Sequence, residues 1–200
     1  DGIVSTLSEF PFGALKRMGF ACEVIVVDGG SSDRTREKAE QLRAKVIVEP
    51  RNGYGRAYKT GFRASNGDIL VALDGDHSYP SSVVPTLLKI MIKESLDFVT
   101  ASRLELMEAK AMSWVHRLGN CILNLMVWLL FRVKLRDSQS GMWVIRRDVL
   151  DRILPKSDGM AFSEEIKIRA FRCCKCSEIP VKYRKRVGKS KISSVLDGIG

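Results

Sequence analysis

Residues 69 to 76 of this chain read Ile-Leu-Val-Ala-Leu-Asp-Gly-Asp, an apolar run of strand length that ends in two acidic residues. Asp74 and Asp76 are two positions apart, so on an extended backbone their side chains point the same way. Gly75 between them allows a tight turn. The carboxyl ends of strands carry the chemistry of many α/β proteins, and two carboxylates directed at one point suit Mg²⁺ or Mn²⁺. We therefore predict that Asp74 and Asp76 hold a divalent metal that binds a diphosphate.

Strand-like and helix-like segments alternate on both sides of this stretch. Further strands are predicted over residues 23–27, 46–48, 97–101, 142–145 and 179–183, with helices or helical loops between them. Such alternation predicts an α/β protein with a mostly parallel central sheet flanked by helices. The sequence contains no internal repeat and no linker, so we expect a single domain over residues 1–200.

Composition restricts the possible partners and the compartment. The chain has 45% hydrophobic and 28% charged residues, as globular proteins do, but its net charge is +10. That charge indicates an anionic partner: nucleic acid, a phosphate-rich substrate or an acidic membrane surface. The five cysteines form no disulfide framework, which favours a reducing compartment. Cys173 and Cys176 have the spacing of half a zinc site, but no second pair completes it.

A long helix is predicted over residues 114–132, which contain no proline and one glycine. Its polar residues His116, Asn120 and Asn124 are four apart and lie on one stripe. The apolar run from Cys121 to Phe131 is too short to span a bilayer. Two alternatives stay open: the helix packs against the sheet, or it lies in a membrane interface.

Nucleotide-binding candidates follow the first strand. Asp28 stands at the carboxyl end of that strand, where its carboxylate could accept a hydrogen bond from a nucleobase. Gly29 and Gly30 allow a ligand to approach the backbone closely. The helix that begins near Asp33 could help to bind anions. We assign Gly55, at the end of a second glycine-containing loop, to the same region.

Together these segments resemble family 2 of the inverting glycosyltransferases, which has the GT-A fold. Within it they are most similar to the dolichyl-phosphate mannose synthases and other polyprenyl-phosphate glycosyltransferases. The matching segments occur in the family order over nearly the whole chain: 28–35, 67–80 with the Asp-x-Asp motif, Asp137-x-x-Ser140-Gly141, and Arg186-x-Gly-x-Ser190-Lys191. Residues 119–124 match the family's amphipathic helix.

The resemblance implies transfer of a sugar from GDP-mannose or UDP-glucose to dolichyl or polyprenyl phosphate, with inversion and with Mg²⁺ or Mn²⁺ on Asp74 and Asp76. The second pKa of the acceptor phosphate is about 6, so at neutral pH it is already a nucleophile. No general base is then needed. The residues expected to hold this phosphate are Arg103, Arg117, Ser140, Arg186, Ser190 and Lys191. The implied partners are the nucleotide sugar, the lipid phosphate and a membrane surface, without nucleic acid. The implied location is the cytoplasmic face of a membrane, where the protein is peripheral or anchored by sequence not present here.

The chain also departs from the family pattern. The family's first strand, which ends in Pro-x-x-Asn-Glu, is not recognised, so an inactive accessory homologue stays an alternative. The family often has two aspartates where this chain has Asp28 and Gly29. Some relatives place a glutamine two residues after the metal motif, where this chain has Ser78.

Two other functions stay open. A transferase with a sugar acceptor, acting in cell-surface glycan synthesis, would need a carboxylate base, and Asp137 is the candidate. A non-enzymatic nucleic-acid-binding domain would fit the net charge, but no recognised nucleic-acid motif is present. Glu164 and Glu165 begin a helix, where they either contact sugar hydroxyls or stabilise the helix end.

Overall fold

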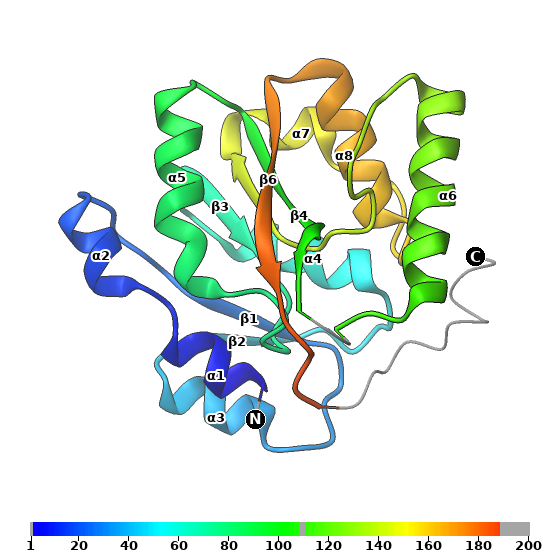
Figure 1. Cartoon of the computed structure of the whole chain (residues 1–200). Coiled ribbons are helices and arrows are strands. Elements are labelled where there is room, and N and C mark those ends of the chain that lie inside the picture. The colour runs from blue at the N-terminus through cyan, green and yellow to red at the C-terminus, as the bar shows by residue number, and fades with distance from the viewer. Residues whose placement is uncertain (1, 109–110, 189–200) are drawn as a thin grey trace.

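The computed structural model describes residues 2–108 and 111–188, arranged as in Figure 1. Its strands are β1 (Ile25–Asp28), β2 (Lys45–Val48), β3 (Ile69–Ala72), β4 (Phe98–Met107), β5 (Trp143–Arg146) and β6 (Cys176–Tyr183). Its α-helices are α1 (Gly2–Ser8), α2 (Phe12–Arg17), α3 (Thr35–Gln41), α4 (Tyr54–Ala64), α5 (Val84–Lys93), α6 (Trp114–Phe131), α7 (Leu150–Ile153) and α8 (Phe162–Cys173). Short 3-10 turns, η1 (Ser81–Val83) and η2 (Arg147–Val149), precede α5 and α7.

The main sheet has four strands in the order β3-β5-β4-β6, and β1 and β2 pair separately. β1 is parallel to β2, and β4 is parallel to β6. β5 is antiparallel to both of its neighbours, β3 and β4. The α/β class agrees with the prediction, but the expectation of a mostly parallel central sheet is wrong at β5. The segment after α6 runs back along the sheet before β5 begins, so β5 starts beside the last residue of β3 and beside Thr100 in the first half of β4.

The reversal of β5 determines where the site lies. Trp143, the first residue of β5, is paired with Ala72 at the end of β3 and with Thr100 in β4. The loop of residues 136–141, which we call the 136–141 loop, therefore approaches the carboxyl end of β3 and the middle of β4, where Arg103 binds Asp137. A parallel β5 would have carried this loop to the opposite edge of the sheet.

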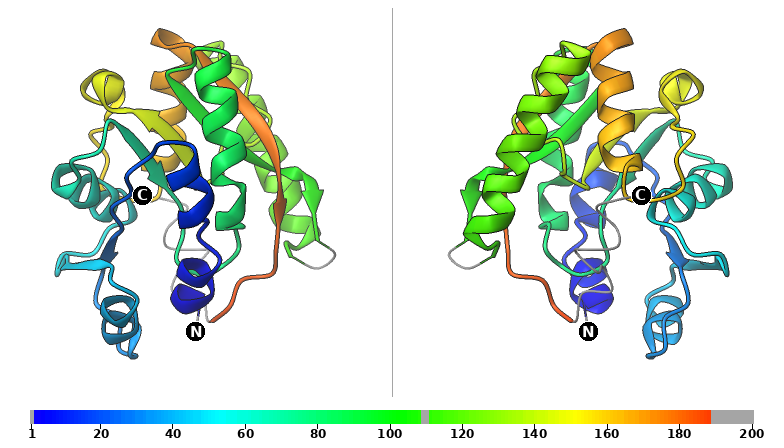
Figure 2. Two further views of the ribbon diagram at one scale, coloured as in Figure 1. Left: turned by 90° about the vertical axis from the view of Figure 1, so that its left-hand side faces the viewer. Right: turned by 90° about the vertical axis from the view of Figure 1, so that its right-hand side faces the viewer.

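Helices cover both faces of the main sheet because apolar side chains alternate along its strands. One face packs on α5, where Leu87 and Met91 meet Val99 and Val144. The other face packs on α4, α7 and α8 and includes Trp143, which is fully buried. Figure 2 shows the same three layers from the sides, with β1, β2 and α3 at one end of the molecule.

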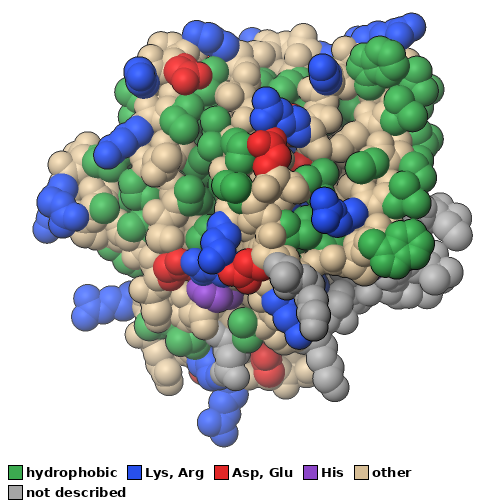
Figure 3. Space-filling model, viewed as in Figure 1, with side chains coloured by type: hydrophobic (Ala, Val, Ile, Leu, Met, Phe, Trp, Pro, Cys, Tyr) green, Lys and Arg blue, Asp and Glu red, His purple; other side chains and the backbone are tan. Residues whose placement is uncertain are grey.

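Helix α6 lies at the edge of the molecule, and most of its surface is exposed. Of its 18 residues only Asn120 and Val127 are buried. Val127 packs on Val133, Leu135 and Ile168, which attaches one face of the helix to the protein. The opposite face consists of exposed apolar side chains: Trp114, Val115, Leu118, Ile122, Leu125, Met126, Leu129 and Leu130. We call these eight residues the α6 apolar face, and Figure 3 shows apolar side chains gathered along this edge.

Among the described helices, α6 is the one that is long and apolar enough to cross a membrane by length and composition, with a mean hydropathy of 1.2. Eighteen residues of helix measure about 27 Å, close to a typical hydrocarbon core of about 30 Å, so the expectation that this segment is too short to span a bilayer is not supported by length and composition. Asn124 on the attached face donates to the Arg136 carbonyl at 2.6 Å and accepts from the Ser138 amide at 2.9 Å. One face of α6 is thus bound to the protein, and among the described residues nothing covers the other, so the interfacial alternative stays a prediction.

Candidate active site

Asp74 follows β3 and lies in a ring of aromatic side chains. The Tyr58 hydroxyl donates to Asp74 Oδ1 at 3.2 Å, and the Tyr54 hydroxyl donates to that of Tyr58 at 3.3 Å. Burial, and then the negative charge of Asp76, raise the pKa of Asp74 to about 6. Both effects disfavour the charged form of a carboxylate, and burial is the larger of the two here.

Asp76 is oriented by the residues that follow it. Its Oδ1 accepts hydrogen bonds from the amide of Ser78, at 3.0 Å, and from the Ser78 hydroxyl. Its Oδ2 faces Arg186, whose Nε is 3.5 Å away. The Asp76 side chain is 24% exposed. The serine at the family's glutamine position thus binds the metal motif itself.

The two aspartates fit a divalent cation. Mg²⁺ and Mn²⁺ sites on phosphorylated substrates use one or two protein carboxylates, and the substrate and water complete the shell. Within residues 2–108 and 111–188, no group of three or more His, Cys, Asp or Glu could hold an ion alone. A metal on Asp74 and Asp76 would therefore depend on the diphosphate for further ligands.

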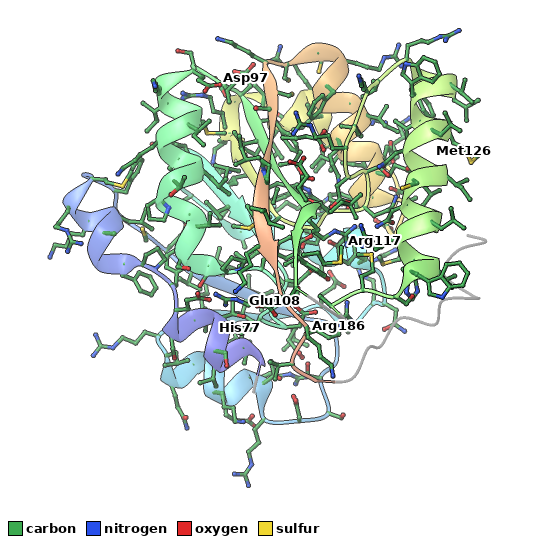
Figure 4. All side chains as sticks on the ribbon, in the orientation of Figure 1. His77, Asp97, Glu108, Arg117, Met126 and Arg186 are labelled. Atoms are coloured by element: carbon green, nitrogen blue, oxygen red, sulfur yellow. The ribbon has the colours of Figure 1, made fainter. Side chains whose placement is uncertain are left out.

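The segment after β6 crosses the metal motif. The Val187 amide donates to the Asp76 carbonyl at 2.9 Å, and the Arg184 amide donates to that of Ser78 at 3.0 Å. In Figure 4, Arg186 and His77 lie near each other at the exit of β6. This segment brings Arg186 to the metal motif, although the two are far apart in sequence.

Contacts of Arg184 with Glu9 and His77, which sequence reasoning missed, hold this segment in place. We call them the Glu9–Arg184 latch. Both terminal nitrogens of Arg184 donate to the Glu9 carboxylate at 2.8 Å. Arg184 Nη1 also lies 3.0 Å from His77 Nε2. Because a guanidinium can only donate, Nε2 is the acceptor and the ring proton is on Nδ1. His77 thus takes part in the latch through its contact with Arg184. Its position next to Asp76 was the one sign in the sequence that it belongs to this region.

The 136–141 loop is held by side chains from several elements. The Glu178 carboxylate of β6 accepts from the amides of Arg136 and Asp137, at 2.6 and 3.1 Å. Asn124 of α6 binds the loop as described above, and the Tyr79 hydroxyl accepts from the Gly141 amide at 2.8 Å. Side chains that satisfy main-chain groups in this way fix the loop before any ligand arrives.

Gly141 joins the loop to the metal motif. A Cβ at this position would lie 2.7 Å from the Tyr54 hydroxyl and 3.0 Å from Asp74 Oδ2. All four tyrosines of the chain, Tyr54, Tyr58, Tyr79 and Tyr183, belong to this region. The sequence predicted the two motifs separately, and the structure places them in contact.

Asp137 and Arg103 form a buried ion pair. Arg103 donates from Nε and Nη2 to the two carboxylate oxygens at 2.8 and 2.7 Å, and its amide donates at 2.9 Å. Burial alone would raise the pKa of Asp137, but the hydrogen bonds and charge of Arg103 outweigh it and hold the pKa below its ordinary value. The side chain is fully buried. Asp137 is therefore placed as the partner of Arg103, and the structure gives no support to a role as a free base.

The other expected phosphate ligands are placed differently from one another. Arg103 lies over the ring of Tyr183, 5.3 Å from its centre, at the edge of the site. Arg117 is exposed on α6 and lies on the side toward the sheet in Figure 4. Ser140 is buried, and its hydroxyl is 3.2 Å from that of Thr100, so in this conformation it does not face a ligand. Ser190 and Lys191 lie outside the described residues.

The nucleotide-binding candidates lie around the end of β1. Asp28 is buried and accepts from the Ser31 amide and from Arg36 Nε, the latter at 2.6 Å. Burial would raise the pKa of Asp28, but these hydrogen bonds outweigh it and lower the pKa. Gly29 and Gly30 are exposed, and a Cβ on either would contact nothing within 4 Å.

Two further positions in this region are structural. Asp33 accepts from the amide and hydroxyl of Thr35, the first residue of α3. Gly55 lies inside α4, where a Cβ would be 2.6 Å from Phe162. Close packing against Phe162 accounts for a glycine at this position, and the expected ligand contact stays a prediction.

Glu49, at the end of β2, is a carboxylate that the sequence analysis did not select. The Glu49 amide donates to the Asp28 carbonyl at 2.9 Å, so Glu49 lies beside the residue that we predicted to bind the nucleobase. Arg51 binds its carboxylate at 2.8 and 3.0 Å, and Thr60 donates at 2.8 Å. The hydrogen bond from Arg51, followed by that from Thr60, lowers the pKa of Glu49 to about 2.

Comparison with known proteins gives consistent results. The sequence model described as "Glycosyl transferase family 2" matches residues 6–154. A dolichyl-phosphate hexose transferase of Haloferax volcanii is 32% identical over 177 residues, which are 88% of this chain and 76% of that protein. A dolichol-phosphate mannosyltransferase of Pyrococcus furiosus is 30% identical over 184 residues, 87% of this chain and 51% of that protein. The chain thus spans about half the length of some relatives.

Solved structures agree on the fold. The glucosyl-3-phosphoglycerate synthase of Mycobacterium tuberculosis, in complex with phosphoglyceric acid, superposes with a TM-score of 0.71 at 22% identity, over 99% of this chain and 70% of that one. The same enzyme with Mn²⁺, uridine-diphosphate and glucosyl-3-phosphoglycerate gives a TM-score of 0.69 at 21% identity, with the same coverage.

Proposed function

The chain belongs to glycosyl transferase family 2, with its GT-A fold, and from this premise we propose that it transfers a hexose from a nucleotide sugar to dolichyl or polyprenyl phosphate. The observation that carries the proposal is the contact, through Gly141, between the metal motif and the 136–141 loop. A diphosphate leaving group at the first and a phosphate acceptor at the second would lie next to each other. The names of relatives about 30% identical support the same acceptor.

The chemistry follows from the charges of the acceptor. A lipid monophosphate with a second pKa of about 6 attacks the anomeric carbon at neutral pH without a base. Its oxygen forms the new bond while the bond to the nucleoside diphosphate breaks on the opposite side, which inverts the anomeric centre. The protein then contributes orientation and charge neutralisation. The commitment of Asp137 to Arg103 agrees with a mechanism that needs no carboxylate base.

Asp74 and Asp76 would hold Mg²⁺ or Mn²⁺, which when bound neutralises the diphosphate and stabilises it as a leaving group. Arg186 lies near Asp76, and Arg103 binds Asp137 of the 136–141 loop. The charges of both arginines lower the pKa of Asp74, so both are close enough to act on the metal motif. GDP-mannose and UDP-glucose both remain candidate donors.

The α6 apolar face supports a lipid acceptor. The helix that carries it also holds the 136–141 loop through Asn124. Arg117, Arg132 and Lys134 are exposed on or just beyond α6, where they could contact anionic head groups. The proposal therefore places α6 in the interface of an anionic membrane, on its cytoplasmic face, with the loop turned toward the lipid phosphate.

A transfer assay tests this function. The protein is incubated with a polyprenyl phosphate in detergent, Mg²⁺ or Mn²⁺, and radiolabelled GDP-mannose or UDP-glucose in parallel. We expect label in the lipid fraction with one donor, loss of that label after chelation, and its recovery when the metal is restored. The variant Asp76→Ala should lose transfer, whereas Asp151→Ala, at an exposed position in α7, should keep it. No lipid label with either donor, despite metal-dependent nucleotide-sugar binding, would exclude the lipid acceptor.

A further inference from the structure

Lys167 is a charged residue that the mechanism above does not use. It lies in α8, and its side chain is fully buried, which is rare for lysine unless it is paired. Its Nζ donates to the carbonyl of Asp137 at 3.0 Å and to the carbonyl of Ser140 at 2.7 Å. A buried ammonium is thus bonded to two main-chain oxygens of the 136–141 loop.

These bonds determine which way the loop carbonyls point. Because Lys167 is inside the protein, the two oxygens that it binds are turned inward. The Ser140 carbonyl also accepts from Trp143 Nε1 and from the Ser163 hydroxyl, both at 3.0 Å. A carbonyl oxygen carries partial negative charge, so an outward carbonyl here would repel a phosphate.

We propose that Lys167 is a positioning residue of the acceptor site, which holds the 136–141 loop with its carbonyls turned away from the lipid phosphate. This inference rests on the proposed function. Lys167 acts through the loop and does not touch the reacting atoms. Without the Lys167 ammonium, the Asp137 carbonyl would lose its hydrogen bond of 3.0 Å and could turn outward.

The charges around Lys167 add to this effect. Asp137 of the loop and Arg103 of β4 neutralise each other, so the ammonium adds positive charge beneath the loop. Glu178 of β6 and Glu164 of α8 are the other charged groups that face it. Burial raises the pKa of both glutamates, and their negative charges in turn act to raise the pKa of Lys167.

The same surroundings predict a pH profile. Burial lowers the pKa of Lys167 to about 7. The acceptor phosphate acquires its second negative charge at about pH 6. The kcat/KM for the acceptor should therefore rise as the phosphate loses its proton and fall as Lys167 loses its own.

The test compares Lys167→Met with Lys93→Met, a matched change at an exposed position in α5. Measured quantities are kcat/KM for a polyprenyl phosphate across pH, donor affinity by calorimetry, and amide hydrogen exchange in residues 136–141. For Lys167→Met we expect kcat/KM to fall by about 10- to 100-fold, the scale of a misplaced binding group. Donor affinity should be unchanged, loop amides should exchange faster, and the alkaline limb of the profile should disappear. Lys93→Met should match the wild type.

An unchanged kcat/KM, or loop amides that exchange at the wild-type rate, would overturn the proposal. A variant that loses donor affinity and melting temperature together with acceptor activity would also overturn it, since a general loss of this kind marks a merely structural lysine. If the wild type transfers no sugar to lipid phosphate, the proposed function fails by itself. The exchange comparison then still decides whether Lys167 holds the loop.

Discussion

At the scale of single residues, the site depends on a glycine between two polar motifs. Gly141 brings the 136–141 loop so near Asp74 that no side chain fits between them. The sequence predicted Asp74, Asp76 and the Ser140-Gly141 pair from local patterns. It did not indicate Lys167, Glu178 or the Glu9–Arg184 latch, because each of these acts on a segment far away along the chain.

The first prediction concerns Gly141→Ala. The added methyl group would meet the Tyr54 hydroxyl and Asp74 Oδ2, so the loop and the metal motif must move apart. We expect transfer activity to fall by about 10- to 100-fold, as displacements of about 1 Å can cost that much. Steady-state kinetics measure the loss. The control is Gly159→Ala, where a Cβ contacts nothing within 4 Å, and an equal loss in both variants would contradict the explanation.

The second prediction concerns the ion pair of Asp137 and Arg103. Asp137→Asn leaves Arg103 buried without its carboxylate, so the free energy of unfolding at pH 7 should fall by about 3–5 kcal/mol. The pKa of Asp137 is lowered, because the hydrogen bonds of Arg103 outweigh burial. The pair therefore stabilises the fold above the unfolded-state pKa of about 4, and this contribution is lost as pH falls through the folded-state value.

Urea denaturation at several pH values checks the second prediction. The difference between wild type and Asp137→Asn should be full at neutral pH, shrink below about pH 4, where the Asp137 carboxylate of the unfolded chain begins to bind protons, and be lost once pH falls below the lowered folded-state pKa. Asp151→Asn, at an exposed position, should change little. A difference that stays constant down to acid pH would mean that the ion pair is not its cause.

At the scale of elements, α6 is the part whose role the sequence left open. Its polar stripe predicted the attached face, and Asn120 is indeed buried there. Whether the remaining apolar residues enter a core depends on what packs against them. In the structure, side chains from the segment after α6 and from α8 cover only the side around Val127.

The third prediction tests the α6 apolar face. Leu118 and Leu125 are each 53% exposed. The double change Leu118→Glu with Leu125→Glu should weaken binding to anionic phospholipid vesicles by at least about tenfold. Two leucine contacts with the lipid are lost, and two negative charges are placed against a negative surface. Thermal stability should change little, as neither side chain is packed.

Vesicle sedimentation measures this binding. The control is Ile92→Glu, an equally exposed apolar position (49%) in α5 on another side of the protein. It should leave vesicle binding unchanged. Equal weakening by Ile92→Glu would place the membrane contact elsewhere.

At the scale of the whole molecule, the net charge of +10 would attract the protein to an anionic membrane surface. Each basic residue near an anionic surface contributes about 1 kcal/mol, and salt screens this within about 10 Å at 0.1 M. The fourth prediction is that vesicle binding weakens steeply between low and high salt when the vesicles contain acidic lipid. Binding to purely zwitterionic vesicles should be weaker and should depend little on salt.

Vesicle titrations over a salt series check the fourth prediction, with Leu118→Glu/Leu125→Glu measured beside the wild type. Apolar contact and charge act through different residues, so the salt slope should change much less than the affinity. A wild-type affinity that ignores both salt and acidic lipid would exclude electrostatic attraction to the membrane.

The sequence by itself determined the local features of this protein: the alternation of strands and helices, the Asp-x-Asp at the end of β3, the long amphipathic α6 and the family resemblance. These follow from side-chain period and turn residues, which act over a few positions. Only the tertiary structure decided the reversal of β5, the contact of Gly141 with Asp74, the pairing of Asp137 with Arg103 and the burial of Lys167. Each of these joins residues that are distant along the chain, and such contacts depend on how the layers pack rather than on any local pattern.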